Sequence, residues 1–418
     1  MRLRRCLIAA ASVFVGSFVG TGSVSAQPPI PPQRTPIVRT TPIGFPQDAG
    51  PHDASVIEWW YFNSFFTTES GKRYSVVGSF FRSGLTPTRK GHYLIYSLTD
   101  LESKTHQAYS VMDKGSITLL KAYTSLAALQ NPNDTKAMAF LAQLQKNELP
   151  KPHRVLPVAA VMTAKPLFSL AMGENRVAQV TPDGRTWKAT LKGDDFTINL
   201  TLAQPTRPAM LVGGKGKTGI TKPDDMYYLT LSRMETTGTL ARGGGAPEKI
   251  TGTGWLDRQW GQSWGVNPNV GWDWFGLRLD DGSEVIAYRL RDTKTGVSLR
   301  ETATLLASDG TQSVGEATIH SYGDTFTDPV SNIAYPSVFT IHLGQPHHLI
   351  LNVLPVFPNQ TIPTLAGGSS AIWEGVVKIV GTRRTGPDTR LYINGEGYME
   401  LVGYKPAVPA PKAAATGK

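Results

Sequence analysis

Cysteine is almost absent from this sequence, because Cys6 is the only one among 418 residues. We expect Cys6 to be removed with an export signal, so the mature chain would lack disulfides, thiolate nucleophiles and cysteine-based metal sites. Charged residues are also few, at 18%, against 40% hydrophobic residues, a composition that excludes wholesale disorder. After the first 26 residues no apolar run approaches the roughly 18 residues of a membrane-spanning helix, so we predict no membrane span.

The first 26 residues have the pattern of a secretory signal. Three arginines, Arg2, Arg4 and Arg5, precede the apolar run Cys6–Val19, and small residues follow up to Ala26. We therefore expect cleavage near Ala26 and an exported protein, either periplasmic or extracellular. The basic residues are compatible with both the Sec and the twin-arginine routes. Their removal lowers the formal net charge from +10 to +7.

The rest of the chain is dominated by short β-branched or aromatic runs, punctuated by Gly, Pro and Lys, which are typical of antiparallel strands. The runs are Tyr74–Arg82, Tyr93–Thr99, Arg185–Leu202, Tyr227–Met234, Phe275–Leu279, Glu284–Leu290, Glu301–Ala307, Ser337–Leu343, Leu349–Leu354, Trp373–Gly381 and Gly395–Tyr404. Many strands at short spacing predict an all-β protein of sandwich or barrel architecture.

Composition divides the chain into further regions. A Pro-rich leader at 27–51 precedes a first domain at 52–245 and a second domain at 246–404, and we place the boundary in the glycine-rich segment just before residue 246. Residues 119–149 differ from the strands, because leucines and Met138 recur near helical spacing, which predicts a helical insertion in the first domain. The tail at 405–418 is predicted to be disordered.

Tryptophan is concentrated in Gly254–Trp274, which holds five of the nine in the sequence. One interpretation is a core belt of indoles whose N–H groups are satisfied by Asp257 and Asp273. The other is a pocket whose aromatic walls hold an apolar ligand beside a desolvated carboxyl group that stays protonated. Aromatic walls would also stabilise a carbocation, because ring faces carry partial negative charge.

A second aromatic cluster follows His52. In a strand, Glu58, Trp60 and Phe62 would share one face, and Trp59 and Tyr61 the other. One face would pack, and the other could line a cavity. Glu58 itself is either a site residue or the ion-pair partner of an arginine. Candidate partners are Arg82, Arg289 and Arg291.

Other motifs are weaker. Gly261–Gly265 matches the G-x-S-x-G pattern of a serine hydrolase with Ser263 as nucleophile, but that motif needs a following helix, and the next residues include Asn267-Pro268. A hydrolase is therefore the less favoured alternative. The eight histidines form no His-x-x-x-His pair, so we expect no metal and no cofactor. We also expect no nucleic-acid partner, because no basic–aromatic ladder is present.

Three ordered blocks together resemble a known superfamily. They are His52 with Glu58–Phe62, the segment Gly252–Phe275, and Trp373–Gly375 with Gly395–Tyr404. Across most of 52–404 the chain resembles the hydroxyneurosporene synthase (carotenoid 1,2-hydratase) and AttH-like lipocalin-like superfamily. The resemblance implies two lipocalin-like antiparallel β-barrel domains and a ligand cavity between or within them.

Activities in that superfamily are diverse: hydration of isoprenoid double bonds, hydration of prenylated plant phenolics, and cyclisation of polyenes. Fold alone therefore does not fix the reaction. In the carotenoid hydratases a Tyr-x-Asp element supplies the acid that protonates the alkene. The aspartate of that element aligns with Asp257, whereas Trp255 stands in place of the tyrosine, which removes a hydroxyl.

These observations lead to one preferred hypothesis, a secreted lipocalin-like protein that binds an apolar unsaturated molecule and adds water to its C=C bond, with Asp257 as the proton donor. Glu58 and Tyr61 would orient water or substrate, and Arg258 and Gln259 would fix the carboxyl group. The expected ligand-binding residues are Glu58, Trp60, Tyr61, Trp255, Arg258, Gln259, Trp260, Trp272 and Trp274. The alternative is a non-catalytic carrier of hydrophobic small molecules. The oligomeric state is not predicted.

Overall fold

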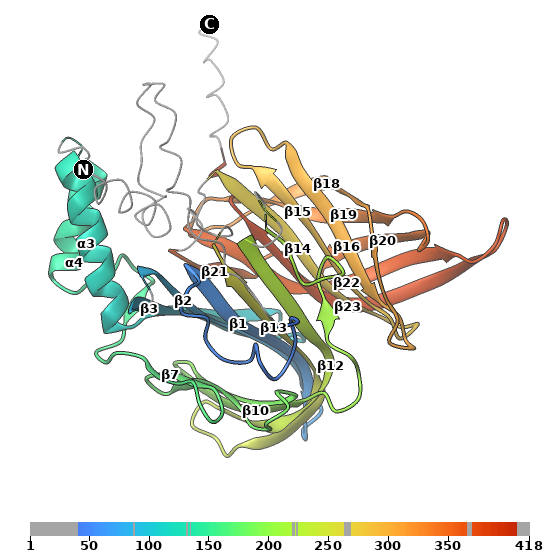
Figure 1. The fold of residues 1–418 in the computed structure, drawn as a ribbon, viewed down its shortest axis with the longest axis horizontal. Helices are drawn as coiled ribbons and strands as arrows, with labels where there is room; N and C mark the ends of the chain where they lie inside the picture. Colours follow the sequence, from blue (N-terminus) through green and yellow to red (C-terminus); the bar gives the residue numbers. More distant parts are fainter. Residues whose placement is uncertain are drawn as a thin grey trace, which may run out of the picture.

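The structure is a computed structural model and describes residues 41–407, except for residues 87, 131–132, 134, 220–221, 223–224, 263–268 and 366–369. The predicted signal segment, most of the Pro-rich leader, Ser263 and most of the predicted tail lie outside the described residues. The described strands form two curled antiparallel sheets, with one pair of helices beside the first sheet (Figure 1). The predicted all-β fold of two lipocalin-like units is thus confirmed.

The first sheet contains thirteen strands in the order β5-β4-β3-β2-β1-β13-β12-β10-β9-β8-β7-β6, with β11 paired to β12. Its strands are β1 (Ile57–Thr68), β2 (Arg73–Thr86), β3 (Arg89–Asp100), β4 (Thr105–Met112), β5 (Arg154–Val155), β6 (Val161–Thr163), β7 (Ser169–Met172), β8 (Asn175–Gln179), β9 (Thr186–Lys192), β10 (Phe196–Ala203), β11 (Met210–Leu211), β12 (Met226–Arg242) and β13 (Glu248–Gly261). Most neighbours follow one another in the sequence and pair antiparallel, as short turns require.

The second sheet contains ten strands in the order β17-β16-β15-β14-β23-β22-β20-β19-β18, with β21 paired to β22. Its strands are β14 (Val270–Leu279), β15 (Glu284–Asp292), β16 (Ser298–Leu306), β17 (Gln312–Gly315), β18 (Ala317–Thr327), β19 (Ala334–Leu343), β20 (Leu349–Pro355), β21 (Thr361–Pro363), β22 (Ala371–Arg384) and β23 (Arg390–Val402). Strand β14, which carries Trp272 and Trp274, pairs with both β15 and β23.

The predicted helical insertion is confirmed as two helices, α3 (Lys114–Gln130) and α4 (Thr135–Gln145). The first helix begins earlier than predicted because Asp113 caps it: its Oδ1 accepts a hydrogen bond from the backbone N–H of Ser116 at 2.7 Å. The helices pack against each other, and α3 also packs on β3 (Figure 1).

The predicted domain boundary before residue 246 is corrected by the sheet topology. The glycine-rich segment joins β12 to β13 within one sheet, where Leu240 pairs with Glu248. Gly243 and Gly244 have φ values of 56° and 75°, so they form a tight hairpin turn rather than a linker. Strand β13 also pairs with β1 from Ile250 to Gly261, and the chain leaves the first sheet only after Gly261.

Successive side chains of β1 point to opposite faces of the sheet, as predicted, so they belong to two different hydrophobic cores. Trp60 and Phe62 point into the core of the first sheet, whereas Tyr61 and Phe65 belong to a second core that also contains Trp274 from the second sheet. The two sheets therefore share a hydrophobic layer, and a third core fills the second sheet on its own. The face of β1 that carries Tyr61 lies against the other domain.

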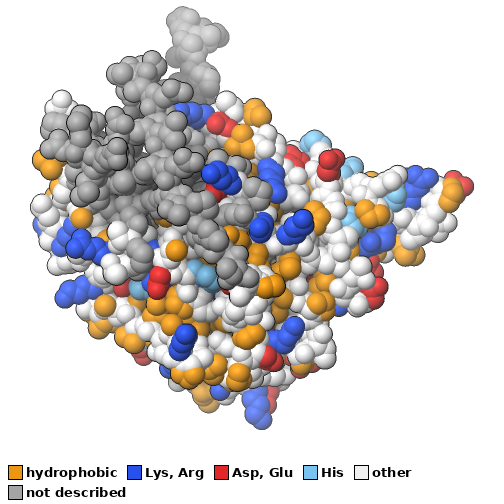
Figure 2. Space-filling view, in the orientation of Figure 1, with side chains coloured by type: hydrophobic (Ala, Val, Ile, Leu, Met, Phe, Trp, Pro, Cys, Tyr) orange, Lys and Arg blue, Asp and Glu red, His pale blue; other side chains and the backbone are white. Residues whose placement is uncertain are grey.

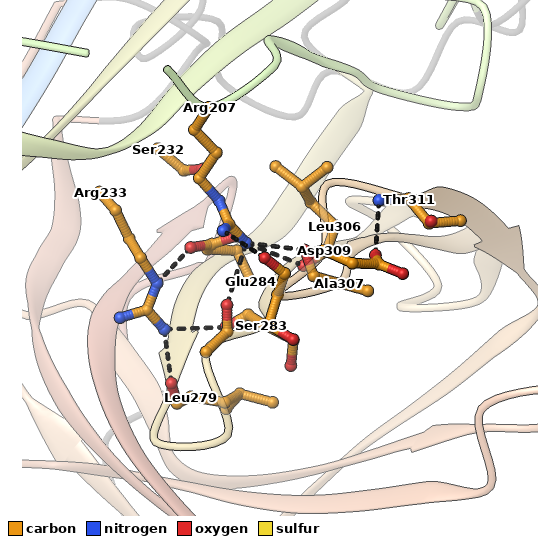
Figure 3. Close-up of polar contacts among 12 residues, drawn as sticks. Arg207, Ser232, Arg233, Leu279, Ser283, Glu284, Leu306, Ala307, Asp309 and Thr311 are labelled. Carbon is orange, nitrogen blue, oxygen red and sulfur yellow. Dashed lines mark hydrogen bonds and ion pairs between the residues drawn. The ribbon is translucent and has the colours of Figure 1, made fainter. Parts of the chain in front are cut away.

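An ionic cluster also joins the two sheets (Figure 3). Glu284 of β15 is fully buried and accepts hydrogen bonds from Arg207 at 2.5 and 3.0 Å, and Nε of Arg233 in β12 donates to its other oxygen. Arg207 also donates to the carbonyls of Gly282 and Ala307, each at 2.9 Å. Burial raises the pKa of Glu284, and the two guanidinium groups oppose that rise. We call this cluster the interdomain clasp.

In the view of Figure 2, basic and acidic side chains are interspersed, so this face of the molecule is neither uniformly basic nor uniformly acidic. Among the described residues, no helix is both long and apolar enough to cross a membrane.

Candidate functional site

A cavity lies between the two sheets, where the shared hydrophobic layer leaves space. This slot has a volume of about 860 Å³, which includes open solvent at its mouth. The described residues that line it are Ile57, Trp59, Tyr61, Val77, Ser79, Phe81, Ile95, Tyr228, Asp257, Gln259, Trp272, Trp274, Ile362, Thr364, Ile372, Glu374, Glu400 and Val402. Mostly apolar walls with a few polar groups are typical of small-molecule sites.

Asp257 lies in this cavity, as predicted, and is 4% exposed. Its Oδ1 accepts hydrogen bonds from the Thr230 hydroxyl at 2.6 Å and the Trp255 indole N–H at 2.7 Å. Its Oδ2 accepts one from the Tyr228 hydroxyl at 2.7 Å. Tyr228 in turn accepts the indole N–H of Trp274 at 2.9 Å, which directs the tyrosine proton toward Asp257.

Burial raises the pKa of Asp257 to about 7, although the donors Thr230, Tyr228 and Trp255 lower it in part. Desolvation penalises the charged carboxylate, whereas each donated hydrogen bond favours it. Asp257 is thus poised near neutrality, where a carboxyl group can both accept and release a proton.

Two further carboxyl groups face the same cavity. Glu374 of β22 and Glu400 of β23 are cross-strand neighbours, and their side chains are hydrogen-bonded to each other. Burial raises the pKa of Glu374 well above its ordinary value, and the charge of Glu400 raises it further. Burial also raises the pKa of Glu400, whose Oε1 accepts the Trp272 indole N–H at 2.8 Å. The pair therefore holds a proton at neutral pH, with Glu374 as the donor to Glu400.

Tyr61 is hydrogen-bonded to the glutamate pair and lies on the strand next to Asp257. Its hydroxyl donates to Glu374 Oε1 at 2.8 Å and accepts from Asn63 Nδ2 at 3.1 Å. In the pairing of β1 with β13, Tyr61 lies directly opposite Asp257. Burial above all raises the pKa of Tyr61, so it remains a neutral hydroxyl.

Five of the nine predicted ligand-binding residues do not line the cavity, and four of these five lie on the opposite face of their strands. Glu58, Trp60, Arg258 and Trp260 lie on the opposite face of β1 and β13, because strand alternation separates them from Tyr61, Asp257 and Gln259. The prediction for these four residues is wrong.

Glu58 instead forms ion pairs with arginines, which is the alternative that the sequence left open for this residue. It binds Arg258 and, at 2.7 Å, Arg82, and its Oε2 also accepts the backbone N–H of His52 at 2.9 Å. Burial alone would raise the pKa of Glu58, but Arg258, His52 and Arg82 hold it below its ordinary value. It is therefore a structural carboxylate.

Arg258 accounts for two of the tryptophans. Its guanidinium lies 4.0 Å from the ring centre of Trp60 and 5.3 Å from that of Trp260. The cation that these indoles hold is thus a guanidinium of the protein itself. Arg258 does not orient Asp257, contrary to the prediction.

The remaining predicted residues surround Asp257. Tyr61, Gln259, Trp272 and Trp274 line the cavity, and Trp255 supports Asp257 from beneath through its indole N–H. The indoles of Trp255, Trp260 and Trp274 are buried in the core, as the core-belt interpretation predicts, but of its two expected acceptors only Asp257 is seen to accept an indole N–H among the described residues. Asp273, the second acceptor expected for the indole N–H groups, instead binds Arg289 at 2.6 Å, Arg291 at 3.0 Å and the Tyr404 hydroxyl at 2.9 Å.

Sequence reasoning missed Tyr228, Thr230, Glu374 and Glu400. Both glutamates lie in the third block of the family resemblance, and that block is the signal in the sequence that could have identified them. Tyr228 and Thr230 alternate on β12 and sit opposite Gln259 and Asp257, a register that the sequence does not reveal. Within the described ranges, no group of three His, Cys, Asp or Glu residues is placed to hold a metal ion.

Solved structures share this fold. A protein of Nitrosomonas europaea described as an AttH is 25% identical, covers 88% of this chain and 99% of its own, and has a TM-score of 0.65. Kievitone hydratase from Nectria haematococca is 15% identical over 88% of this chain and 95% of its own, with a TM-score of 0.60. CghA, solved with Sch210972, is 12% identical over 93% and 97%, with a TM-score of 0.55.

No curated protein sequence matches the chain. The family model described as AttH-like, in contrast, matches residues 36–404, which include both sheets and all three cavity carboxyl groups. The chain belongs to the AttH-like family.

Proposed function

We propose that this protein is a hydratase that binds an apolar, unsaturated small molecule between its two sheets and adds water across a C=C bond by acid catalysis. One observation carries the proposal: three carboxyl groups with raised pKa values face one aromatic-walled cavity, and of these Asp257 and Glu374 are buried and Glu400 is half-buried. Perturbed acids gathered in a cleft are a mark of proton-transfer sites. The fold that kievitone hydratase shares is compatible with such chemistry, but the residues of this cavity supply the argument.

The first step assigns the proton donor. Glu374 holds a proton at neutral pH, whereas Asp257 accepts three hydrogen bonds that favour its ionised form. The sequence predicted Asp257 as the proton donor. We instead assign protonation of the alkene to Glu374. The π electrons form the new C–H bond, the proton leaves Glu374, and a carbocation remains on the adjacent carbon.

The second step uses Asp257 as the base. Water adds its oxygen to the cation, and Asp257 takes the proton that this water loses, so that the product has gained one H and one OH. After the product leaves, Asp257 releases this proton to water and Glu374 takes one up from water, which restores both groups for the next turnover. Tyr61 holds Glu374 in place through its hydrogen bond.

The aromatic walls stabilise the intermediate. Trp272 and Trp274 line the cavity beside Glu400 and Tyr228, and Trp274 meets Tyr61 edge to face with ring centres 5.7 Å apart. Ring faces presented to a desolvated cation stabilise it by about 2 kcal/mol or more. A finer relationship to hydroxyneurosporene synthase (carotenoid 1,2-hydratase) is part of this proposal.

The test uses water enriched in heavy oxygen. Purified protein is incubated with neutral terpenoid alcohols and prenylated phenols, and products are analysed by mass spectrometry. We expect one heavy oxygen atom in the product, and Glu374→Gln and Asp257→Asn should each lower its rate of formation by about 10²- to 10⁴-fold.

Glu58→Asp is the control variant, because Glu58 lies on the other face of β1. The carrier alternative predicts a different outcome: ligand is bound and recovered unlabelled by every variant alike. That result would reject the hydratase. Full activity in Glu374→Gln would reject the donor that we assign.

A further inference from the structure

The outward face of the second sheet carries exposed apolar side chains. Along β20 and the adjoining halves of β22 and β23, exposed and buried side chains alternate, because successive residues of a strand point to opposite faces. Four of the exposed side chains are hydrophobic, with exposed fractions from 38% to 85%: Ile350, Leu354, Val380 and Tyr392. The outward positions of β9 and β10 in the first sheet are instead polar: Lys188, Thr190, Asn199 and Thr201. Apolar outward positions are therefore not a general property of the strands in this protein.

The strand register joins these side chains into one patch. Val380 of β22 lies directly opposite Asn352 of β20. Ile350 and Leu354 flank Asn352 at a spacing of two residues, so both are diagonal neighbours of the valine. Tyr392 of β23 is a third diagonal neighbour. Diagonal neighbours on one face of a sheet are about 7–8 Å apart, within reach of long side chains. We call Ile350, Leu354, Val380 and Tyr392 the outer patch.

The hairpin that joins β22 to β23 projects from the body of the second sheet (Figure 1). Strand β14 pairs with β23 only from Gly395 to Val402, so the first residues of β23 extend past this neighbour. Leu391 and Tyr392 point to opposite faces of the hairpin, yet they are 51% and 85% exposed. Basic and hydrophobic side chains gather on this projection, with an acidic one at its end (Figure 2). Both faces of the hairpin are therefore accessible to a partner.

Basic side chains surround the outer patch. Lys378, Arg384 and Arg390 lie on the same outward face, and none of the three forms an ion pair among the described residues. Arg384 donates only to backbone carbonyls. Glu396, the acid opposite Lys378, is bonded to a buried arginine, and Asp388 is the one acid in the turn between the two strands. Positive charge is therefore in excess around the patch.

A second copy of the chain is a poor occupant of this face. A symmetric dimer places the same surface on both sides of its interface, so the cations around Arg384 and Arg390 would meet the same cluster on the other copy. Like charges brought together at an interface are destabilising. A bilayer that contains anionic lipids has the opposite sign. Tyrosine and leucine are also side chains that bind at the boundary between lipid head groups and acyl chains.

We propose that the outer patch and the hairpin between β22 and β23 form a docking surface for an anionic lipid bilayer. Tyr392 and Leu391 enter the head-group region, and Lys378, Arg384 and Arg390 bind lipid phosphates around them. The protein rests on the membrane without spanning it. Docking does not depend on the reaction proposed for the cavity, although a bilayer is also where apolar small molecules accumulate.

Vesicle sedimentation tests the docking surface. Exported protein is mixed at neutral pH with vesicles of phosphatidylcholine alone or with about 30% phosphatidylglycerol, and the bound fraction is measured. We expect binding to the anionic vesicles to be at least about tenfold tighter than binding to the neutral ones. Binding to the anionic vesicles should weaken as salt is added, because salt screens the attraction.

Two paired variants separate this face from general effects of charge. Arg384→Gln with Arg390→Gln removes two outward cations, each worth about fivefold in binding, so the affinity for anionic vesicles should fall about 25-fold. Arg176→Gln with Lys188→Gln is the matched control, because these two exposed cations are diagonal neighbours on the outward face of the first sheet. The control should change the affinity by less than about twofold.

A fluorescent label tests whether the hairpin enters the head-group region. Tyr392→Cys places a thiol on the outer patch of a chain whose only other cysteine, Cys6, lies in the predicted signal segment. The emission of an environment-sensitive dye on this thiol should move to shorter wavelength with anionic vesicles. The same dye on Asn199→Cys, on the outward face of β10, should not respond. Wild-type protein treated in the same way measures any labelling at Cys6.

The contrary results are distinct. Binding to neither kind of vesicle, equal binding to both, or an equal loss of binding in the two paired variants overturns the docking surface. A dye on Tyr392→Cys whose emission stays unchanged while the protein is bound also overturns it. A dimer that forms without lipid, and that Val380→Thr with Tyr392→Ser abolishes in sedimentation velocity, would assign the face to a second copy instead.

Discussion

Glu58 and Glu374 provide a matched pair for testing the electrostatic reasoning. Each is a glutamate with 1% exposure, and they belong to the two different sheets. Glu58 is charged, because Arg258 and Arg82 hold its pKa down against the effect of burial. Glu374 is protonated, because burial and its neighbour Glu400 raise its pKa. The same substitution, Glu→Gln, should therefore have opposite effects at the two positions.

Glu58→Gln leaves Arg258 fully buried without its carboxylate. Removing one partner of a buried ion pair costs about 3–5 kcal/mol in the free energy of unfolding. For a domain of about 150–250 residues, each kcal/mol lowers the melting temperature by about 2–4 °C, so we expect a fall of about 6–20 °C. The penalty should shrink below pH 4.5, because a depressed pKa contributes stability above the unfolded value and loses it as pH falls.

Glu374→Gln replaces a neutral acid by a neutral amide. The amide can still donate toward Glu400 and accept from Tyr61, so at pH 5 the change in stability should stay within about 1 kcal/mol. A raised pKa means that the wild type loses stability as pH increases above 4.5, by at most about 1.4 kcal/mol per pH unit. The variant escapes this loss and should become relatively more stable toward pH 8.

Urea unfolding of the wild type and both variants between pH 4 and pH 8 measures these differences. The reasoning is refuted if the two variants are equally destabilised at pH 7, or if the stability of Glu374→Gln relative to the wild type does not increase with pH.

Three further predictions concern other parts of the molecule. Tyr228→Phe removes a donor that favours the ionised form of Asp257, so the rise of hydratase activity with pH, centred near 7 in the wild type, should move upward by about one pH unit in a pH–rate profile. Glu284→Gln removes the carboxylate that Arg207 and Arg233 share in the interdomain clasp (Figure 3). It should lower the free energy of unfolding, measured in urea, by roughly 3 kcal/mol. A change below about 0.5 kcal/mol would show that backbone carbonyls satisfy Arg207 equally well. Intact-mass analysis of exported protein should place the mature N-terminus at Gln27, and a longer chain would contradict the predicted cleavage.

The periodicity of the sequence correctly predicts strands, but it does not show which face of a strand lines the cavity. Alternation in β1 correctly separates Trp60 and Phe62 from Trp59 and Tyr61, since a strand has a fixed two-residue period. It does not state which face meets the other domain. Periodicity therefore does not distinguish tryptophans that line the cavity from structural ones, and Trp60 belongs to the structural face.

Glycine content was misleading for a related reason. Three successive glycines suit both a flexible linker and a tight hairpin, and local sequence does not distinguish the two. The distinction comes from the pairing of β13 with β1, strands separated by about 180 residues. The boundary prediction failed because it used only local information.

The proton-donor assignment required both domains. Tyr61 and Glu374, whose side chains meet at 2.8 Å, are separated by 313 residues. On an isolated second sheet, Glu374 would face water on the side that β1 now covers, and without desolvation its pKa would approach the ordinary value for glutamate. The raised pKa is thus a property of the packed pair of sheets, and no single motif contains it. If Glu374 is the proton donor, loosening the contact between the sheets must lower the rate of catalysis even where every cavity residue is retained. Water that enters the slot would stabilise the ionised carboxylate of Glu374, whereas the reaction needs this group to be protonated.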